Sequence, residues 1–240
     1  MKKLFFVILA TLTGAIAVNA QSLPVHPRVE VGGNFANIIT KYDGKDHTAD
    51  IKPGVWAGVA VEIPIGTSGM FVAPGLTYKM QGTKETDSKS VVPGTTIDSE
   101  LSSTLHYLSV PVDLGIRVDL APVAISVEFG PYFAYALKGT TTESISYNGS
   151  YDRLPAEVKD MLERAKLDTT ADVFEKDKEG NVFTKRFDVG VGASAAVEFK
   201  RFYLRIGSEL GLMNIAGKSL ENEGVSNKNA NFYVSVGFRL

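Results

Sequence analysis

One alternating segment constrains the fold of this chain more than any other feature. In "HYLSVPVDLGIRVDL", residues 106–120, every even position from Leu108 to Leu120 is apolar. The odd positions between them carry mostly small, polar or charged residues, including Asp113 and Arg117. Successive side chains of a β-strand point to opposite faces, so the segment predicts a strand with one apolar and one polar face.

The same alternation recurs along the chain and predicts eight strands. They cover residues 28–38, 54–63, 70–81, 106–120, 122–137, 186–199, 202–213 and 231–240. Short turns alternate with long polar connections, so in an up-and-down arrangement the turns gather at one end and the loops at the other. We therefore predict an all-β fold, an eight-stranded antiparallel up-and-down transmembrane β-barrel with long outer loops, one of which carries a short helix.

Two classes of barrel share this pattern and differ in which face meets water. A lipocalin-like soluble barrel keeps its apolar face inside, whereas a transmembrane barrel turns that face toward lipid. The polar face here is rich in glycine, alanine and serine, which suit a narrow eight-stranded lumen. Aromatic residues also gather near the predicted strand ends, as in the two girdles of membrane barrels. Both features favour the transmembrane class.

Charged residues on the polar face are nearly balanced, five basic against seven acidic. Buried charges need partners, so we predict a charge network that fills the lumen. Its predicted members are Arg28, Glu30, Glu62, Lys79, Asp113, Arg117, Glu128, Asp188, Glu198, Arg205, Glu209 and Arg239. Pro74, Pro111 and Pro131 fall inside predicted strands, where each removes a backbone donor, so we expect β-bulges at these positions.

The first twenty residues are typical of a secretory signal peptide. Lys2 and Lys3 precede an apolar stretch, and "VNA" at 18–20 offers a cleavage site after Ala20. We expect residues 21–240 to form one barrel domain in the outer membrane of a Gram-negative cell. An uncleaved membrane helix is the alternative for this segment.

Four segments carry a family resemblance. "HYLSVPVDLGIRV", "EFGPYFAYAL", "RFDVGVGASAAVEF" and "FYVSVGFRL" are similar to the PorT-like outer-membrane β-barrel family of Bacteroidota. The resemblance covers residues 28–240 and implies an eight-stranded barrel in the outer membrane, without a catalytic motif. The last segment, with Phe238 third from its end, also resembles the signal that barrel-assembly machinery reads.

Other functional classes find little support in the residues. The chain has no cysteine and a net charge of −2, so we expect no thiol chemistry and no nucleic-acid partner. "GVGASA" at 190–195 lies inside a predicted strand rather than before a helix, which argues against a dinucleotide site. His47 and His106 fall at the loop end, where a rim hydrolase is the enzymatic alternative. We predict no catalytic residues, no cofactor and no metal.

The longest connection, residues 138–185, contains one helical pattern, in "RLPAEVKDMLERAKL". Its apolar residues Leu154, Val158, Met161 and Leu162 either contact a partner as part of a lid or pack on the barrel rim. A polar hairpin turn follows at 175–181, with Val173 and Phe174 before it and Val182 and Phe183 after it.

Together these features predict a non-enzymatic outer-membrane barrel with a filled polar lumen. Its outer loops would bind a partner or ligand, or support a surface assembly. Its other expected partners are outer-membrane lipid and the barrel-assembly machinery. A narrow porin-like channel and a soluble periplasmic lipocalin-like barrel are the two alternatives.

Overall fold

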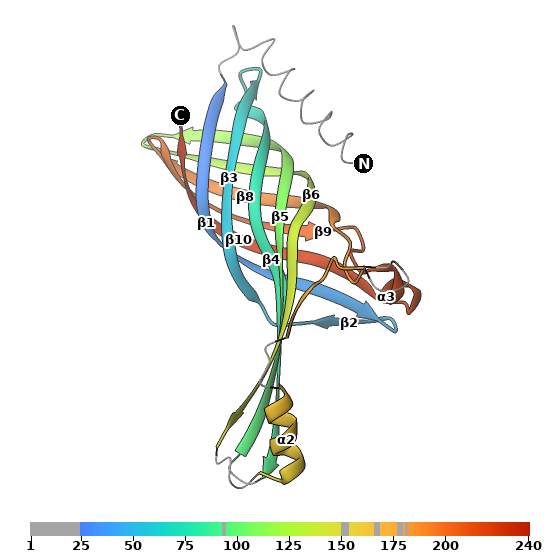
Figure 1. Ribbon diagram of the computed structural model, residues 1–240. Helices are drawn as coiled ribbons and strands as arrows, with labels where there is room; N and C mark the ends of the chain where they lie inside the picture. Colours follow the sequence, from blue (N-terminus) through green and yellow to red (C-terminus); the bar gives the residue numbers. More distant parts are fainter. Residues whose placement is uncertain (1–24, 93–94, 150–153, 166–168, 177–179, 181) are drawn as a thin grey trace.

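Eight long antiparallel strands form a closed ring in the computed structural model (Figure 1). The structure describes residues 25–240 except 93–94, 150–153, 166–168, 177–179 and 181. The ring strands are β1 (His26–Tyr42), β3 (Lys52–Ile65), β4 (Met70–Val92), β5 (Thr95–Leu120), β6 (Val123–Asn148), β8 (Phe187–Phe199), β9 (Phe202–Gly211) and β10 (Ser226–Arg239). Pairing of β10 with β1, from Arg28 opposite Arg239 to Lys41 opposite Ser226, closes the ring. The predicted eight-stranded up-and-down barrel is confirmed.

Four short elements complete the described part of the chain. Strand β2 (Lys45–Thr48) pairs with the end of β1, and β7 (Thr169–Asp172) pairs with β6. The helices are α2 (Ala156–Ala165) and α3 (Lys218–Asn222). In the described ranges, neither helix has the length and apolar character to cross a membrane. The signal-peptide prediction concerns residues that lie outside the described ranges.

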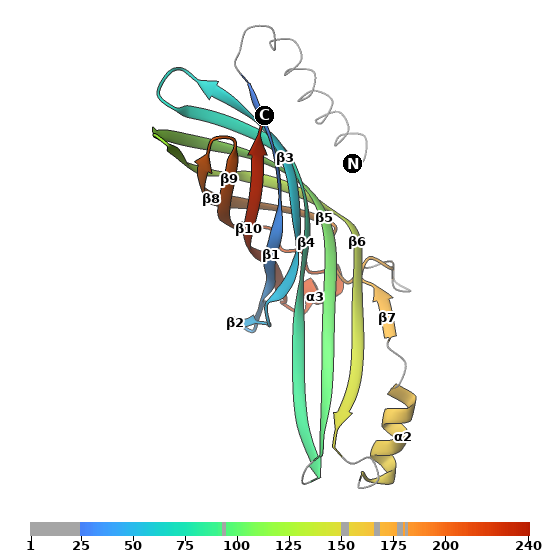
Figure 2. The same ribbon diagram turned by 90° about the vertical axis from the view of Figure 1, so that its left-hand side faces the viewer.

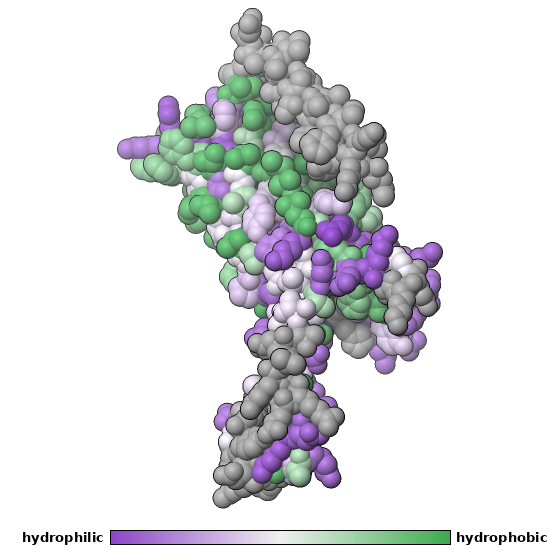
Figure 3. Space-filling model, viewed as in Figure 1, coloured by the Kyte–Doolittle hydropathy of each residue, from purple (hydrophilic) through white to green (hydrophobic). Residues whose placement is uncertain are grey.

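The apolar face of the strands lies on the outside of the barrel. In β5, the side chains of Leu114, Ile116 and Val118 are about half exposed, at 50%, 48% and 49%. The neighbouring Arg117 side chain is only 13% exposed and takes part in ion pairs inside the barrel. On the face seen in Figure 3, hydrophobic residues gather over the half of the barrel that carries the short turns. This orientation is the opposite of a soluble lipocalin-like barrel.

We call these outward apolar residues the apolar belt. They include Val29, Val31, Val55, Val59, Leu114, Ile116, Val118, Ile125, Val127, Phe129, Val197, Leu204, Ile206, Leu210 and Val236. Exposed phenylalanines border the belt, with Phe35 against Phe232 at the loop end, ring centroids 6.4 Å apart. Phe202 packs edge-on against Phe238 at the turn end, at 5.1 Å. Aromatic residues at both borders are typical of membrane barrels.

Two of the expected outer loops are largely strand. Residues 83–92 of β4, 95–105 of β5 and 139–148 of β6 continue beyond the belt as one antiparallel sheet, which we call the three-stranded extension (Figures 1 and 2). The prediction of loops at 82–105 and throughout 138–185 was therefore wrong. These segments are polar but rich in threonine and serine with scattered Ile and Val, and threonine, Ile and Val are favourable on a pleated surface exposed on both sides.

The predicted bulges at the prolines are absent from the described ladders. Pairing runs through Pro74, Pro111 and Pro131 without a change of register. The shifts lie between Ser90 and Val92, and between His106 and Tyr107. Each proline lies where pairing with one of its two neighbouring strands is interrupted. Its missing backbone N–H is accommodated there, so no extra residue is inserted as a bulge.

Helix α2 forms where the helical pattern predicts it but lies elsewhere than expected. Figures 1 and 2 show it beside the far end of the three-stranded extension, away from the barrel mouth. It is therefore neither a lid nor a helix packed on the rim. Leu154 is buried at 4% exposure and Val158 is half-buried, so neither offers an open contact surface. The side chains of Met161 and Leu162 lie outside the described part of the structure.

Candidate functional site in the barrel lumen

The turn-side half of the lumen is organised around Arg28 of β1. Its guanidinium group donates to Glu62 Oε1 at 2.9 Å and, through both terminal nitrogens, to the two Glu128 carboxylate oxygens at 2.7 and 2.6 Å. Arg28 is 5% exposed and Glu128 is 1% exposed. Such a two-pronged contact between a guanidinium and a carboxylate fixes both side chains and satisfies charges that would be costly to bury alone.

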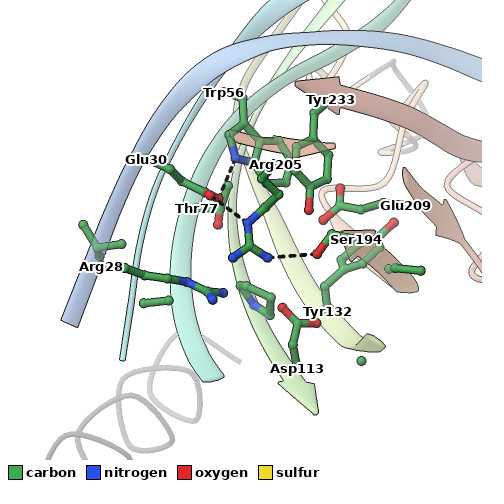
Figure 4. Close-up of a pocket in the computed structure, with 16 residues that line it drawn as sticks. Arg28, Glu30, Trp56, Thr77, Asp113, Tyr132, Ser194, Arg205, Glu209 and Tyr233 are labelled. Carbon is green, nitrogen blue, oxygen red and sulfur yellow. Dashed lines mark hydrogen bonds and ion pairs between the residues drawn. The ribbon is translucent and has the colours of Figure 1, made fainter. Parts of the chain in front are cut away.

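Arg205 of β9 extends this pairing across the lumen. Its Nη1 lies 2.8 Å from Glu128 Oε2, and its Nε lies 3.1 Å from Glu30 Oε2. Figure 4 shows the guanidinium reaching between Glu30 and Ser194, to which it donates at 2.9 Å. Glu30 also accepts a hydrogen bond from Trp56 Nε1 at 3.1 Å. Four strands are thereby tied together through one arginine and its partners.

A second group of ions lies nearer the short turns. Arg239 Nη2 lies 3.0 Å from Glu62 Oε2 and its Nη1 lies 3.8 Å from Glu198 Oε1. Arg117 pairs with Glu198 and lies 3.8 Å from Glu62. The four residues alternate in sign, and Glu62 links them to Arg28. Beyond them, a hollow of about 490 Å³ opens at the turn end and is lined by Arg117, Glu198 and Arg239.

The loop-side half of the lumen contains fewer ions and more neutral donors. Lys79 pairs with Glu209 and lies with its ammonium 3.9 Å from the centre of the Tyr132 ring. Asp188 accepts hydrogen bonds from the Tyr132 hydroxyl at 3.1 Å and from Asn229 Nδ2 at 2.8 Å. Lys79 and Asp188 have side chains with essentially no exposure. Cation–π contact and amide donors therefore stabilise these two buried charges.

An apolar cap closes the loop end of the lumen. Val173, Phe174 and Ile215 come from two different loops and pack with Tyr107 and Leu105 of β5 in one buried cluster. Gly139 of β6 makes room for the cap, because a Cβ at this position would lie 2.5 Å from Val173 Cγ2. The backbone of Val173 also donates to the Gly139 carbonyl at 3.3 Å.

The sequence prediction missed this cap, although one signal pointed to it. The apolar pairs that flank the predicted hairpin turn stand out in an otherwise polar connection. Lys176 pairs with Val182 in an isolated antiparallel bridge, as expected for such a turn. Of the four flanking residues, Val173 and Phe174 are buried, whereas Phe183 is 59% exposed.

A small polar cavity separates the two halves of the lumen. It has a volume of about 30 Å³, enough for about two water molecules. Asp113, Arg28, Arg205, Trp56 and Tyr233 are among its lining residues (Figure 4).

The structure brings most of the predicted charge network together. Ten of the twelve residues form ion pairs with other members of the network. Asp188 instead accepts hydrogen bonds from neutral groups. The carboxylate of Asp113 makes neither an ion pair nor a hydrogen bond within the described residues, and faces the cavity. The arrangement crosslinks all eight ring strands and leaves little room for solute.

The two rim histidines are placed differently. His106 lies on the outer face of β5, with its Nδ1 2.6 Å from the Tyr78 hydroxyl. His47 belongs to β2, but its side chain is outside the described structure. Among the described residues, no group of three or more His, Cys, Asp or Glu side chains is arranged to hold a metal ion.

Comparison with known proteins gives one family match. A family model described as "Outer membrane protein beta-barrel domain" matches residues 19–217. No curated protein sequence matches the chain. The attachment invasion locus protein Ail of Yersinia pestis is a similar solved structure, with 13% identity and a TM-score of 0.40 over 90% of this chain and 98% of Ail. Neisserial surface protein A gives 12% identity and a TM-score of 0.38 over 89% of this chain and 97% of that one.

Proposed function

Because the chain belongs to the outer membrane protein beta-barrel domain family, we propose that it is a non-enzymatic membrane barrel that presents a protein-binding sheet at the cell surface. The family match supports the outer membrane as its location. The closed ring with its apolar belt has the architecture of proteins that span this membrane with strands.

The three-stranded extension is the observation that carries the proposal. It projects from the loop end of the barrel, opposite the short turns (Figures 1 and 2). In membrane barrels the short turns face the periplasm and the long connections face outward, which supports a position of the extension outside the cell. Residues 85–90 of β4 are exposed. Within the described residues, β4 has no strand partner on its outer edge from 85 to 92, so an extended segment of another protein can pair there.

The filled lumen supports a role as a rigid anchor rather than a pore. Ion pairs cross the turn-side half, and the apolar cap closes the loop-side half. A porin-like channel needs a continuous wet path, which this filling interrupts twice. The proposed absence of catalysis is supported by the same arrangement, because the ionisable lumen groups mostly contact one another rather than solvent.

The proposal also includes four more specific assignments, which sequence motifs alone support. These are membership of the PorT-like family, an origin in Bacteroidota, cleavage of a signal peptide near Ala20 and recognition by the barrel-assembly machinery.

The proposed orientation is tested by adding trypsin to intact cells that display the chain. We expect cleavage after Lys89, which is exposed on the extension, and no cleavage after Lys200 in the turn between β8 and β9. Cleavage at Lys200 with protection of Lys89 would place the extension in the periplasm and contradict the proposal.

The proposed partner contact is tested with a photo-crosslinking amino acid at Ser88, which is exposed on the outer strand of the extension. The matched control places the same amino acid at Thr67, which is exposed in the turn between β3 and β4. We expect discrete crosslinked protein species from Ser88 and none of these species from Thr67. Absence of crosslinks from Ser88, in cells where the barrel is folded, would contradict a partner-binding extension.

A further inference from the structure

A cationic, hydroxyl-rich patch lies where the apolar belt ends on the outer face of β4, β5 and β6. Lys52 at the start of β3 donates through Nζ to Ser102 Oγ and Thr104 Oγ1, both at 2.6 Å. Thr104 stands directly opposite Thr140, and His106 stands opposite Lys138 in the β5–β6 ladder. Residues paired in this way share one face of the sheet, so the lysines and hydroxyls form one surface.

Gly82 of β4 allows this surface to form. It pairs with Thr104 and so lies between β3 and the hydroxyls that Lys52 reaches. Its φ of +147° suits glycine, and a Cβ there would overlap the carbonyl oxygen of Ser103. Glycine at this position therefore lets β4 and β5 lie close together beside the two hydroxyls on β5 that Lys52 reaches.

The charges of the patch are only partly neutralised. Lys84 forms an ion pair with Glu100 at 2.8 Å. The charged groups that act on His106 are Lys138 and Lys52, both positive. Burial first, and then these two lysines, lower the pKa of His106 below its usual 6.5, so its imidazole is neutral at pH 7 and Nδ1 can accept from Tyr78. Glu100 also acts on Lys52, but it is shared with Lys84, its ion-pair partner, so the cations around His106 are only partly neutralised.

We propose that this patch, formed by Lys52, Lys138, Ser102, Thr104 and Thr140, binds a phosphate-bearing lipid head group of the outer leaflet. The inference goes beyond the proposed function, which concerns the extension and a protein partner.

Continuity with the belt favours a lipid as the occupant. Tyr78, which holds His106, stands opposite Leu108, where the outward apolar positions of β5 begin. The patch therefore lies at the level of the head groups of any lipid that contacts the belt. Two ammonium groups and three hydroxyls supply the charge-assisted hydrogen bonds that a phosphate monoester accepts. A lipid bound here would have its acyl chains on the belt and its phosphate on the patch.

The experiment titrates the full folded chain in neutral detergent with short-chain phosphatidic acid and follows binding by calorimetry. Phosphatidylcholine with the same acyl chains and inorganic phosphate are the comparison ligands. We expect phosphatidic acid to bind about tenfold more tightly than phosphatidylcholine, as for one or more charge-assisted hydrogen bonds. Inorganic phosphate is expected to bind more weakly than phosphatidic acid, because it lacks the apolar contact. Equal binding of the two phospholipids, or of phosphatidic acid and free phosphate, would overturn the proposal.

Charge variants identify the site. The double variant Lys52→Gln with Lys138→Gln is expected to lose the preference for phosphatidic acid. The single variant Lys138→Gln changes only an exposed side chain, so it keeps the test valid if the double variant does not fold, and we expect severalfold weaker binding from it. The matched control, Lys89→Gln with Lys176→Gln, removes two exposed charges elsewhere and is expected to bind as the original chain does. An equal loss of binding in the control would show general electrostatic attraction and contradict a site.

Discussion

The two halves of the lumen are filled by different chemistry from different parts of the sequence. In the turn-side half, ring strands provide the ions, with Arg28, Glu128 and Arg205 at the centre. In the loop-side half, connecting segments provide the apolar side chains of Phe174 and Ile215, which pack on strand residues. The short turns contain too few residues to fold back over one end of the barrel, whereas the long connections can fold over the other end. The length of the connections therefore decides which end has an apolar cap and which end is filled by ion pairs between ring strands.

The largest expected loss of stability comes from removing the central carboxylate of the turn-side half of the lumen. In Glu128→Gln, Arg28 and Arg205 lose the carboxylate that both contact, and two buried cations are left with fewer partners. We expect the free energy of unfolding to fall by about 3–5 kcal/mol. Urea unfolding in detergent, followed by the fluorescence of the buried Trp56, measures the change.

The matched control for this variant is Glu100→Gln. Glu100 also pairs with a cation, Lys84, but its side chain is 40% exposed. We expect a loss below about 1 kcal/mol, because water screens the pair. Equal losses in the two variants would show that burial does not distinguish the lumen network.

A smaller loss of stability is expected when a large side chain is removed from the apolar cap. Phe174→Ala removes a ring that is 7% exposed and leaves a void beside Tyr107 and Leu105. We expect a loss of about 3 kcal/mol in the free energy of unfolding, at the low end for a buried phenylalanine because the cap lies at the mouth. Phe183→Ala, at a 59% exposed position in the same connection, is expected to cost much less. If both variants behave alike, the cap is not a packed cluster.

The smallest expected effect is a change in the pKa of His106, which lies on the outer face of the barrel rather than in the buried lumen. Lys138→Gln removes a positive charge that lowers the pKa of His106, so we expect this pKa to rise toward 6.5. Imidazole NMR signals followed across pH measure it. Burial is the larger cause and remains, so the rise is partial; no rise at all would contradict the contact.

The lowered pKa of His106 also sets a pH dependence. The unfolded chain takes up a proton near pH 6.5, before the folded chain does, so acid favours unfolding. The contribution of this group to stability is complete above pH 6.5 and is lost as pH falls from there to the folded pKa. Replacing His106 by Phe should remove this part of the pH dependence in urea unfolding.

The sequence predicts the ring and its polarity because both follow from side-chain alternation. Leu114 outside and Arg117 inside are properties of one strand, and they need no knowledge of neighbours. Which ions meet depends on register, so the convergence of Arg28, Glu62 and Glu128 from three strands could not be derived. Asp113 shows what alternation does not predict. It shares the pattern of its neighbours, yet it lines the cavity and has no ion-pair or hydrogen-bond partner among the described residues.

Features built by polar or connecting segments were the ones that prediction missed. The exposed part of β4, including Thr86 and Ser88, has no apolar face and so reads as loop. Only its pairing with β5 makes it a strand. The bulge near His106, rather than at the prolines, and the burial of Phe174 likewise depend on tertiary contacts that local patterns do not contain.

The central claim is that ion pairs close the lumen in its turn-side half and an apolar cap closes it in its loop-side half. Ion conductance across a planar bilayer tests this claim most directly. The full chain, folded and inserted, is predicted to give no steady current at moderate voltage. Phe174→Ala is predicted to give none either, because the ionic half remains closed. A steady ion current from the unmodified chain would contradict the filled lumen and favour the narrow channel.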